Sequence, residues 1–189
     1  MSATSAAVDS MPETGMWSID SAHSTVSFKV RHHAVATFRS SFTNVSGAYD
    51  GAERQLTGEV QVSDITLTGL DRLKGHILTP DFFNAEEFPA FSFQTTAIEQ
   101  DGEKLTVEGE LTLRGVTKPI TATGSVRGPQ MTRHGDGHVS QRLGIDLATT
   151  IDRREWGVNF NNEVSEGVIN LGWDVEIEAA LELYINAED

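Results

Sequence analysis

The chain has 189 residues, which suits one domain with a sizeable buried core. Its formal net charge of −14 repels phosphate backbones and anionic headgroups, which argues against nucleic-acid partners and against stable attachment to an acidic membrane. The absence of cysteine excludes disulfides, thiol catalysis and cysteine-based metal sites.

Residues 1–14 predict a disordered polar tail. They are mostly small and polar, contain no Lys or Arg, and hold no apolar run of seven residues. Such a segment is neither a secretory signal nor a membrane anchor. We therefore expect a cytoplasmic protein without stable membrane insertion, whose single domain spans residues 15–186.

The first predicted strand contains Val26, Phe28 and Val30, which alternate with polar residues and so share one face. His32 and His33 follow, and as neighbours in a strand they would point to opposite faces. Residues 33–37 are then a candidate for a short helical turn.

Helix signals are concentrated in the next part of the chain. Thr68 can cap a short helix, with Asp71 three residues on, near the positive end of the helix. Leu70, Leu73 and Ile77 then fall on one face at spacings of three and four.

A second helical turn is predicted over residues 79–89, because Pro80 suits its first position and Pro89 ends it. It carries Phe82 and Phe83 on an aromatic stretch that holds five of the nine phenylalanines of the chain. These rings are consistent with ordinary core and with the wall of a binding cavity.

Strand signals return after this turn and continue to the end of the chain. Phe91 and Phe93 share one face, and the longest alternation covers residues 169–183, where every odd position is apolar. A strand of about 15 residues is far longer than usual and is common in barrels, where strands cross the wall obliquely. Turn signals at 50–51, 101–102 and 134–138 separate the strands and predict an antiparallel sheet that closes on itself or folds as a sandwich.

Candidate catalytic and metal sites are few. His134, Asp136 and His138 could supply two imidazoles and a carboxylate, but the two glycines between them favour a solvated turn. Glu86 and Glu87 diverge by about 100° on a helical turn, so a solvent-facing pair is favoured over a general acid/base pair. We expect neither catalytic residues nor a metal.

Four stretches, in order and with matching spacing, resemble the YceI-like family of polyisoprenoid-binding proteins. They are WSIDSAHSTVSFKVRH at 17–32, HILTPDFFN with FPAFSF between 76 and 93, GELTLRGVTKP at 109–119, and RREWG at 153–157. The resemblance covers about residues 16–184. It implies an all-β fold, an extended antiparallel eight-stranded lipocalin-like β-barrel with one to three short helices.

The resemblance also implies a long apolar cavity that holds a polyisoprenoid, either a polyprenyl chain or an isoprenoid quinone, for storage or transport, with no enzymatic activity and no other cofactor. Family members are often dimers, so a homodimer is a possible assembly. The alternatives are a barrel with a filled core that acts as a stress-response or interaction module, and an enzyme for a hydrophobic substrate.

The candidate site residues follow from the resemblance and from the apolar faces. The expected cavity lining consists of Phe28, Val30, Phe38, Phe42, Phe82, Phe83, Phe91, Phe93, Leu111, Trp156 and Phe160. His32, His76 and Arg153 are candidates for contact with a polar headgroup. The alternative, which we favour, is that they hydrogen-bond to buried backbone or to carboxylates of the wall.

Overall fold

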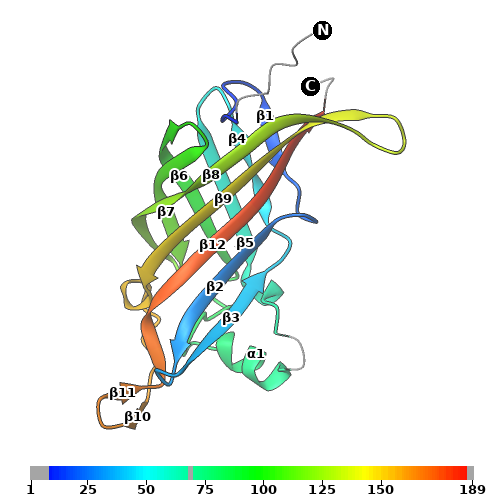
Figure 1. The fold of residues 1–189 in the computed structure, drawn as a ribbon. Helices are drawn as coiled ribbons and strands as arrows, with labels where there is room; N and C mark the ends of the chain where they lie inside the picture. The colour runs from blue at the N-terminus through cyan, green and yellow to red at the C-terminus, as the bar shows by residue number, and fades with distance from the viewer. Residues whose placement is uncertain (1–8, 68–69, 187–189) are drawn as a thin grey trace.

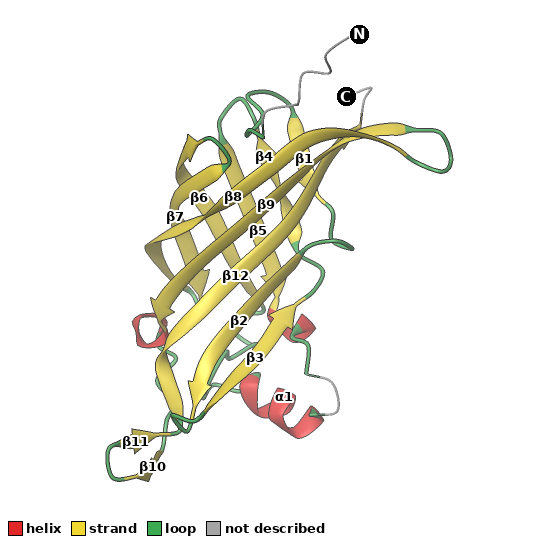
Figure 2. Cartoon of the chain, viewed as in Figure 1, coloured by secondary structure: helices red, strands yellow, loops and turns green. Residues whose placement is uncertain are grey.

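The structure, a computed structural model, describes residues 9–67 and 70–186. The chain is built almost entirely of strands (Figures 1 and 2). In chain order the elements are β1 (Met16–Ile19), β2 (Thr25–His32), β3 (Ala36–Phe42), β4 (Ser46–Asp50), β5 (Gln55–Gln61), η1 (Val62–Asp64), α1 (Asp71–Ile77), β6 (Ala90–Asp101), β7 (Lys104–Leu113), β8 (Val116–Arg133), β9 (Val139–Asp152), η2 (Arg153–Trp156), β10 (Glu163–Ser165), β11 (Val168–Ile169) and β12 (Leu171–Asn186).

The strands close into an antiparallel barrel. Eight of them form the ring in the order β1, β4, β5, β6, β7, β8, β9 and β12, and the pairing of β1 with β12 closes it. β2 and β3 continue the sheet from β12, below β1 and β4 as drawn in Figure 1. The predicted eight-stranded antiparallel barrel is therefore confirmed.

The last strand shows why this sequence forms a barrel wall. From Val175 to Leu183 the odd positions of β12 are buried or half-buried, whereas Asp174, Glu176 and Glu178 on the other face are exposed. β12 pairs with β9 along 13 consecutive positions, so one apolar face runs nearly the whole length of the barrel. The strand begins at Leu171, two residues later than predicted.

The two ends of the barrel are covered differently. The upper end, as drawn in Figure 1, carries the β8–β9 turn and the end of β12, and the lower end carries α1 and the β10–β11 hairpin. At the lower end the segment between β5 and β6 packs against the free edge of β3, where Ile65 bridges to Phe42 and the Thr66 N–H donates to the Ser41 carbonyl at 2.8 Å. Ile65 and Thr66 thus cover the free edge of β3, and α1 follows later in the same connection between β5 and β6.

The helix predictions are only partly right. α1 begins at Asp71, with Ile77 buried and Leu73 half-buried on one face, but Leu70 lies before the helix and its side chain is 48% exposed. The predicted cap, Thr68, lies outside the described residues. In the described part of the chain no helix is long and apolar enough to cross a membrane.

The other two predicted helical turns are not helices. Residues 79–89 form consecutive hydrogen-bonded turns instead, in which the Phe83 N–H donates back to the Ile77 carbonyl at 3.0 Å and Asn84 has a φ of +50°. The His33–Thr37 segment begins as the three-residue turn between the paired His32 and Ala36, in which His33 and Ala34 have positive φ and the Val35 N–H donates to the His32 carbonyl at 3.1 Å.

The predicted disordered tail, residues 1–14, is wrong for its second half. Residues 9–14 run across the upper end of the barrel, where the Tyr49 hydroxyl donates to the Pro12 carbonyl and the Gly128 N–H donates to the Asp9 carboxylate, both at 2.8 Å. These partners are distant in sequence, so local composition does not reveal them. Residues 1–8 lie outside the described range.

The upper half of the barrel is packed across its interior, while Val62 and Ile65 belong to the same core at the lower end. Tyr49, Val126, Leu143 and Leu183 are all 0% exposed, and Met11 from the N-terminal segment is 4% exposed beside them. Inward side chains from opposite walls meet there, as in a small barrel that fills its own interior. The lower half differs, and it contains the candidate site.

Candidate functional site

The lower half of the barrel encloses an apolar cavity of about 350 Å³. Such a volume falls within the range of small-molecule pockets, roughly 300–1,000 Å³. Its walls come from the inward faces of strands throughout the barrel and from α1 and the turns after it. The cavity reaches the surface beside α1, because His76 lines it and yet has a side chain that is 42% exposed.

Phenylalanine rings form much of one wall. The rings of Phe28, Phe42, Phe83 and Phe91 contact one another with centroids 5.0 to 6.3 Å apart, and Phe38 joins them through Phe28. Tilted and edge-to-face pairs at such distances are favourable arrangements for aromatic side chains. The wall therefore combines rings from β2, β3 and β6 with one from the turns after α1.

Ten of the 11 residues predicted to line the cavity do so. They are Phe28, Val30, Phe38, Phe42, Phe82, Phe83, Phe91, Phe93, Leu111 and Phe160. Trp156 does not line it. Its indole is 2% exposed, and the ring N–H donates to the Leu111 carbonyl at 3.0 Å, so the η2 turn directs this side chain into the wall instead.

Many lining residues were not predicted. The aliphatic ones include Val26, Leu56, Val60, Leu73, Ile77, Leu113, Ile120, Leu147, Ile151, Val158, Leu171, Val175, Ile177 and Leu181. Several of them belong to the same alternating faces, so the period-two pattern contains the signal for them. The pattern does not show which inward residues face a cavity and which pack against the opposite wall.

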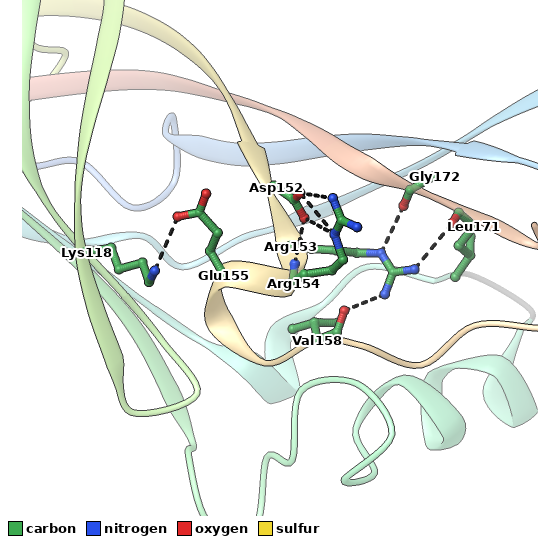
Figure 3. A network of polar contacts seen from close by, with 8 residues as sticks. All are labelled: Lys118, Asp152, Arg153, Arg154, Glu155, Val158, Leu171 and Gly172. Carbon is green, nitrogen blue, oxygen red and sulfur yellow. Dashed lines mark hydrogen bonds and ion pairs between the residues drawn. The ribbon is translucent and has the colours of Figure 1, made fainter.

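Arg153 is the most buried charged residue of the cavity wall. Its guanidinium donates to the carbonyls of Val158 at 2.6 Å, Gly172 at 2.9 Å, Phe160 at 3.0 Å and Leu171 at 3.3 Å (Figure 3 shows three of these bonds). Burial lowers the pKa of Arg153 to about 10, so it remains charged at neutral pH. It thus satisfies buried backbone, which is the alternative favoured from the sequence.

The η2 turn that carries Arg153 is held by its neighbours. The Asp152 carboxylate accepts from the Arg154 backbone N–H at 3.0 Å and pairs with the Arg154 guanidinium at 2.5 Å (Figure 3). Hydrogen bonding from Arg154 lowers the pKa of Asp152 to about 2. Both Arg153 and Arg154 also lie over the Trp173 ring, at 4.5 and 4.8 Å from its centroid.

Of the other polar lining residues, His32, His76 and Asn170 lie near Arg153, whereas Glu59, Ser92 and Thr149 line the cavity from β5, β6 and β9. His76 contacts the Phe160 ring at 5.2 Å, and its Nε2 lies 3.0 Å from the Asp81 carboxylate. His32 lies opposite Leu171 in the β2–β12 ladder. Its ring stacks on that of His33 at 3.9 Å, which corrects the expectation that the two rings point apart, because positive φ at His33 turns the chain.

Asn170 completes this group, which we call the polar cluster: His32, His76, Arg153 and Asn170. The Asn170 backbone is satisfied, since its carbonyl accepts from the His33 N–H and its own N–H donates to the Asn162 carbonyl, both at 2.8 Å. Its side-chain Oδ1, however, is buried without a hydrogen-bond partner among the described residues. Leaving such an acceptor unpaired costs on the order of 1–3 kcal/mol.

Comparison with known proteins identifies the family. The model of the YceI-like domain matches residues 17–183, nearly the whole described chain. The chain belongs to the YceI-like family. A Staphylococcus aureus (strain bovine RF122 / ET3-1) protein named as a UPF0312 protein is 31% identical over 175 residues, which cover 90% of this chain and 98% of that protein.

Solved structures show the same YceI-like barrel. The Burkholderia cenocepacia protein BcnA superposes with a TM-score of 0.67 at 20% identity, over 87% of this chain and 98% of that one. A Saccharophagus degradans domain described as a polyisoprenoid binding domain gives 0.68 at 13% identity, over 88% and 97% of the two chains. At these identities the likeness establishes the fold.

One cluster of ionisable side chains of this YceI-like barrel lies outside the cavity. Near its upper end, ligand atoms of Asp20, His23 and Glu182 lie within 4.8 Å of one another. Arg142 donates to Asp20 at 2.5 Å and to Glu182 at 2.8 Å, so its guanidinium already compensates the two carboxylates. The arrangement is an ion cluster of the barrel wall.

The histidines of the β8–β9 turn and the acidic pair near Phe83 each have a local role. The rings of His134 and His138 stack at 4.0 Å, with His134 bonded to Ser140 and His138 bonded to Asp136. Glu86 and Glu87 are both exposed, as predicted for a solvent-facing pair.

Proposed function

We propose that this protein binds an amphiphilic polyisoprenoid, a polyprenyl chain or an isoprenoid quinone, in the lower cavity of the barrel, for storage or transport. The observation that carries the proposal is the chemistry of that cavity: mostly apolar walls from strands around the barrel, with the polar cluster at the end that reaches the surface. An amphiphile with a long apolar tail and a small polar head matches this distribution.

The physical basis is apolar burial. Each square ångström of tail removed from water contributes about 25 cal/mol, and an isoprenoid tail leaves no polar group unpaired against the phenylalanine wall. The Saccharophagus degradans neighbour, described as polyisoprenoid-binding, supports this assignment. The rival interpretation as a barrel with a filled core is disfavoured, because the lower half is hollow.

The test is direct. The purified protein is extracted with organic solvent and the extract is analysed by mass spectrometry, and the delipidated protein is then melted with and without a polyprenol. At about 100 times the dissociation constant we expect a rise in melting temperature of roughly 5–10 °C. The proposal would be contradicted if the extract contained no stoichiometric lipid and the polyprenol produced no thermal shift.

The remaining parts of the hypothesis stay predictions. They are the cytoplasmic location, the homodimer, the lack of enzymatic activity and the choice between storage and transport. A role as a binding protein is consistent with Arg153 and His76, whose polar atoms are held by backbone carbonyls and by Asp81.

A further inference from the structure

The polar cluster offers little to an anionic headgroup. Arg153 already donates four hydrogen bonds to backbone carbonyls, and a guanidinium has only five N–H groups to donate. His76 is engaged by Asp81. A phosphate in the mouth would have to displace these partners and leave several buried carbonyls unpaired.

The electrostatic field of the whole chain also disfavours an anionic headgroup. Arg153 is the one Lys or Arg side chain among the described residues that line the cavity. The whole chain carries a formal charge of −14, and Glu163 and Glu166 are exposed in the β10–β11 hairpin at the lower end. Such a field disfavours the approach of a diphosphate.

Asn170 differs from its neighbours because its carboxamide is free. Its Oδ1 is buried and unpaired, and the amide forms no hydrogen bond to any described residue. It lies beside Leu171, whose carbonyl is bound by Arg153, so it belongs to the same end of the cavity. A carboxamide both donates and accepts, so it can pair with a hydroxyl or with a carbonyl, and a rotation of the side chain brings the buried Oδ1 to the ligand.

We propose that Asn170 anchors a neutral oxygen headgroup, the hydroxyl of a prenyl alcohol or prenyl phenol or the carbonyl of a quinone, and that the site selects such lipids over prenyl diphosphates. This rests on the proposed function, since it assumes an isoprenoid in the cavity. The tail supplies affinity through burial, and the hydrogen bond to Asn170 determines which headgroup is accepted.

The experiment measures the binding of geranylgeraniol, geranylgeranyl diphosphate and the hydrocarbon phytane to the delipidated full chain. The wild type should bind the alcohol more tightly than the diphosphate. Asn170→Leu should weaken binding of the alcohol roughly three- to tenfold, the usual contribution of one neutral hydrogen bond, whereas phytane, which forms no hydrogen bond, should bind at least as tightly as to the wild type. A prenyl quinone tested in parallel distinguishes an accepting carbonyl from a hydroxyl.

The matched control is Asn159→Leu, the same change at an exposed asparagine that does not line the cavity, and it should bind all ligands like the wild type. Thermal melting checks folding, and Asn170→Leu should be at least as stable as the wild type because it removes an unpaired acceptor. Unchanged alcohol binding in Asn170→Leu, or tighter binding of the diphosphate, would overturn this inference alone. Failure of every ligand to bind, phytane included, would overturn the proposed function as well.

Discussion

The upper and lower halves of this barrel share the long strands β6 to β9 and β12, yet the upper half is packed across its interior and the lower half encloses a cavity. On β12, Leu183 is fully buried and does not line the cavity, whereas Val175, Ile177 and Ala179 are only half-buried and line it together with the buried Leu181. The alternation of apolar and acidic residues is the same along the whole strand. The difference therefore lies in what faces each segment across the barrel.

At the upper end the opposite side is supplied by additional chain. Met11 from the N-terminal segment, Trp17 from β1 and Tyr49 from β4 are all at most 4% exposed and belong to the packed core. At the lower end α1 and the turns after it face the interior, where they line the cavity without filling it. A strand pattern thus predicts an inward face, and the covering segments decide whether that face becomes core or cavity.

The largest expected effect comes from shortening matched side chains in the two halves. Leu183→Ala should reduce the free energy of unfolding by about 3 kcal/mol, because it opens a void where the leucine is 0% exposed. Ile177→Ala should cost about 1 kcal/mol in the ligand-free protein, since it enlarges a space that already exists. Urea unfolding of both variants measures the difference. Equal losses in the free energy of unfolding would contradict the distinction between a packed upper half and a hollow lower half.

A charge placed in the hollow half should separate binding from folding. Phe93→Asp puts a carboxylate against the lipid tail, so isoprenoid binding should weaken at least tenfold while the ligand-free protein still folds, because the cavity can admit water. Binding titration and circular dichroism report the two properties. Val164→Asp, at an exposed valine of the β10–β11 hairpin, is the control and should bind normally. Unfolding of Phe93→Asp would show that this position is packed core.

The N-terminal segment offers the converse test. Met11→Ala should reduce stability by about 2 kcal/mol, at the lower limit for a buried methionine because the segment lies near the chain end and can readjust. Isoprenoid affinity should not change, since Met11 does not line the cavity. A loss of affinity comparable to that of Phe93→Asp would mean that the cavity continues into the upper half.

The barrel and most of the phenylalanine wall were predictable from the sequence because both depend on local period. Phe28 and Val30, or Phe91 and Phe93, must share a face if the chain is extended there, whatever surrounds it. The orientation of Trp156 was not predictable in this way. It depends on the η2 turn and on the Leu111 carbonyl, which lies 45 residues away in sequence.

Long-range contacts also explain the other errors. The order of residues 9–14 depends on Tyr49 and Gly128, and the unpaired carboxamide of Asn170 depends on which groups the fold leaves out of reach. Residues 79–89 carry proline signals suited to a helical turn, yet their amides bond back to carbonyls at the end of α1. Composition and spacing describe one segment at a time. The order of residues 9–14, the unpaired side chain of Asn170 and the turns at 79–89 all depend on contacts between two segments.

The smallest expected effect is a difference in pH dependence. Burial alone would raise the pKa of Asp20 in the upper half, but hydrogen bonds from Arg142 and His23 outweigh it and lower the value from 3.8 to about 2. A carboxyl whose pKa is depressed in the folded state stabilises the fold above its unfolded pKa, and that contribution is lost as pH falls from about 4 towards 2. After allowance for solvent screening we expect it to be about 1 kcal/mol.

Urea unfolding between pH 2 and 6 compares the wild type with Asp20→Asn, which should lose stability at pH 6 and show a shallower decline towards pH 2. Asp152→Asn is the partner variant in the lower half, where Arg154 also holds the pKa of Asp152 at about 2. Since Asp152 caps the η2 turn that carries Arg153, its substitution should also weaken isoprenoid binding, whereas Asp20→Asn should leave binding unchanged. Equal pH slopes in the wild type and Asp20→Asn, or a binding defect in Asp20→Asn, would show that the two halves are coupled more tightly than their packing indicates.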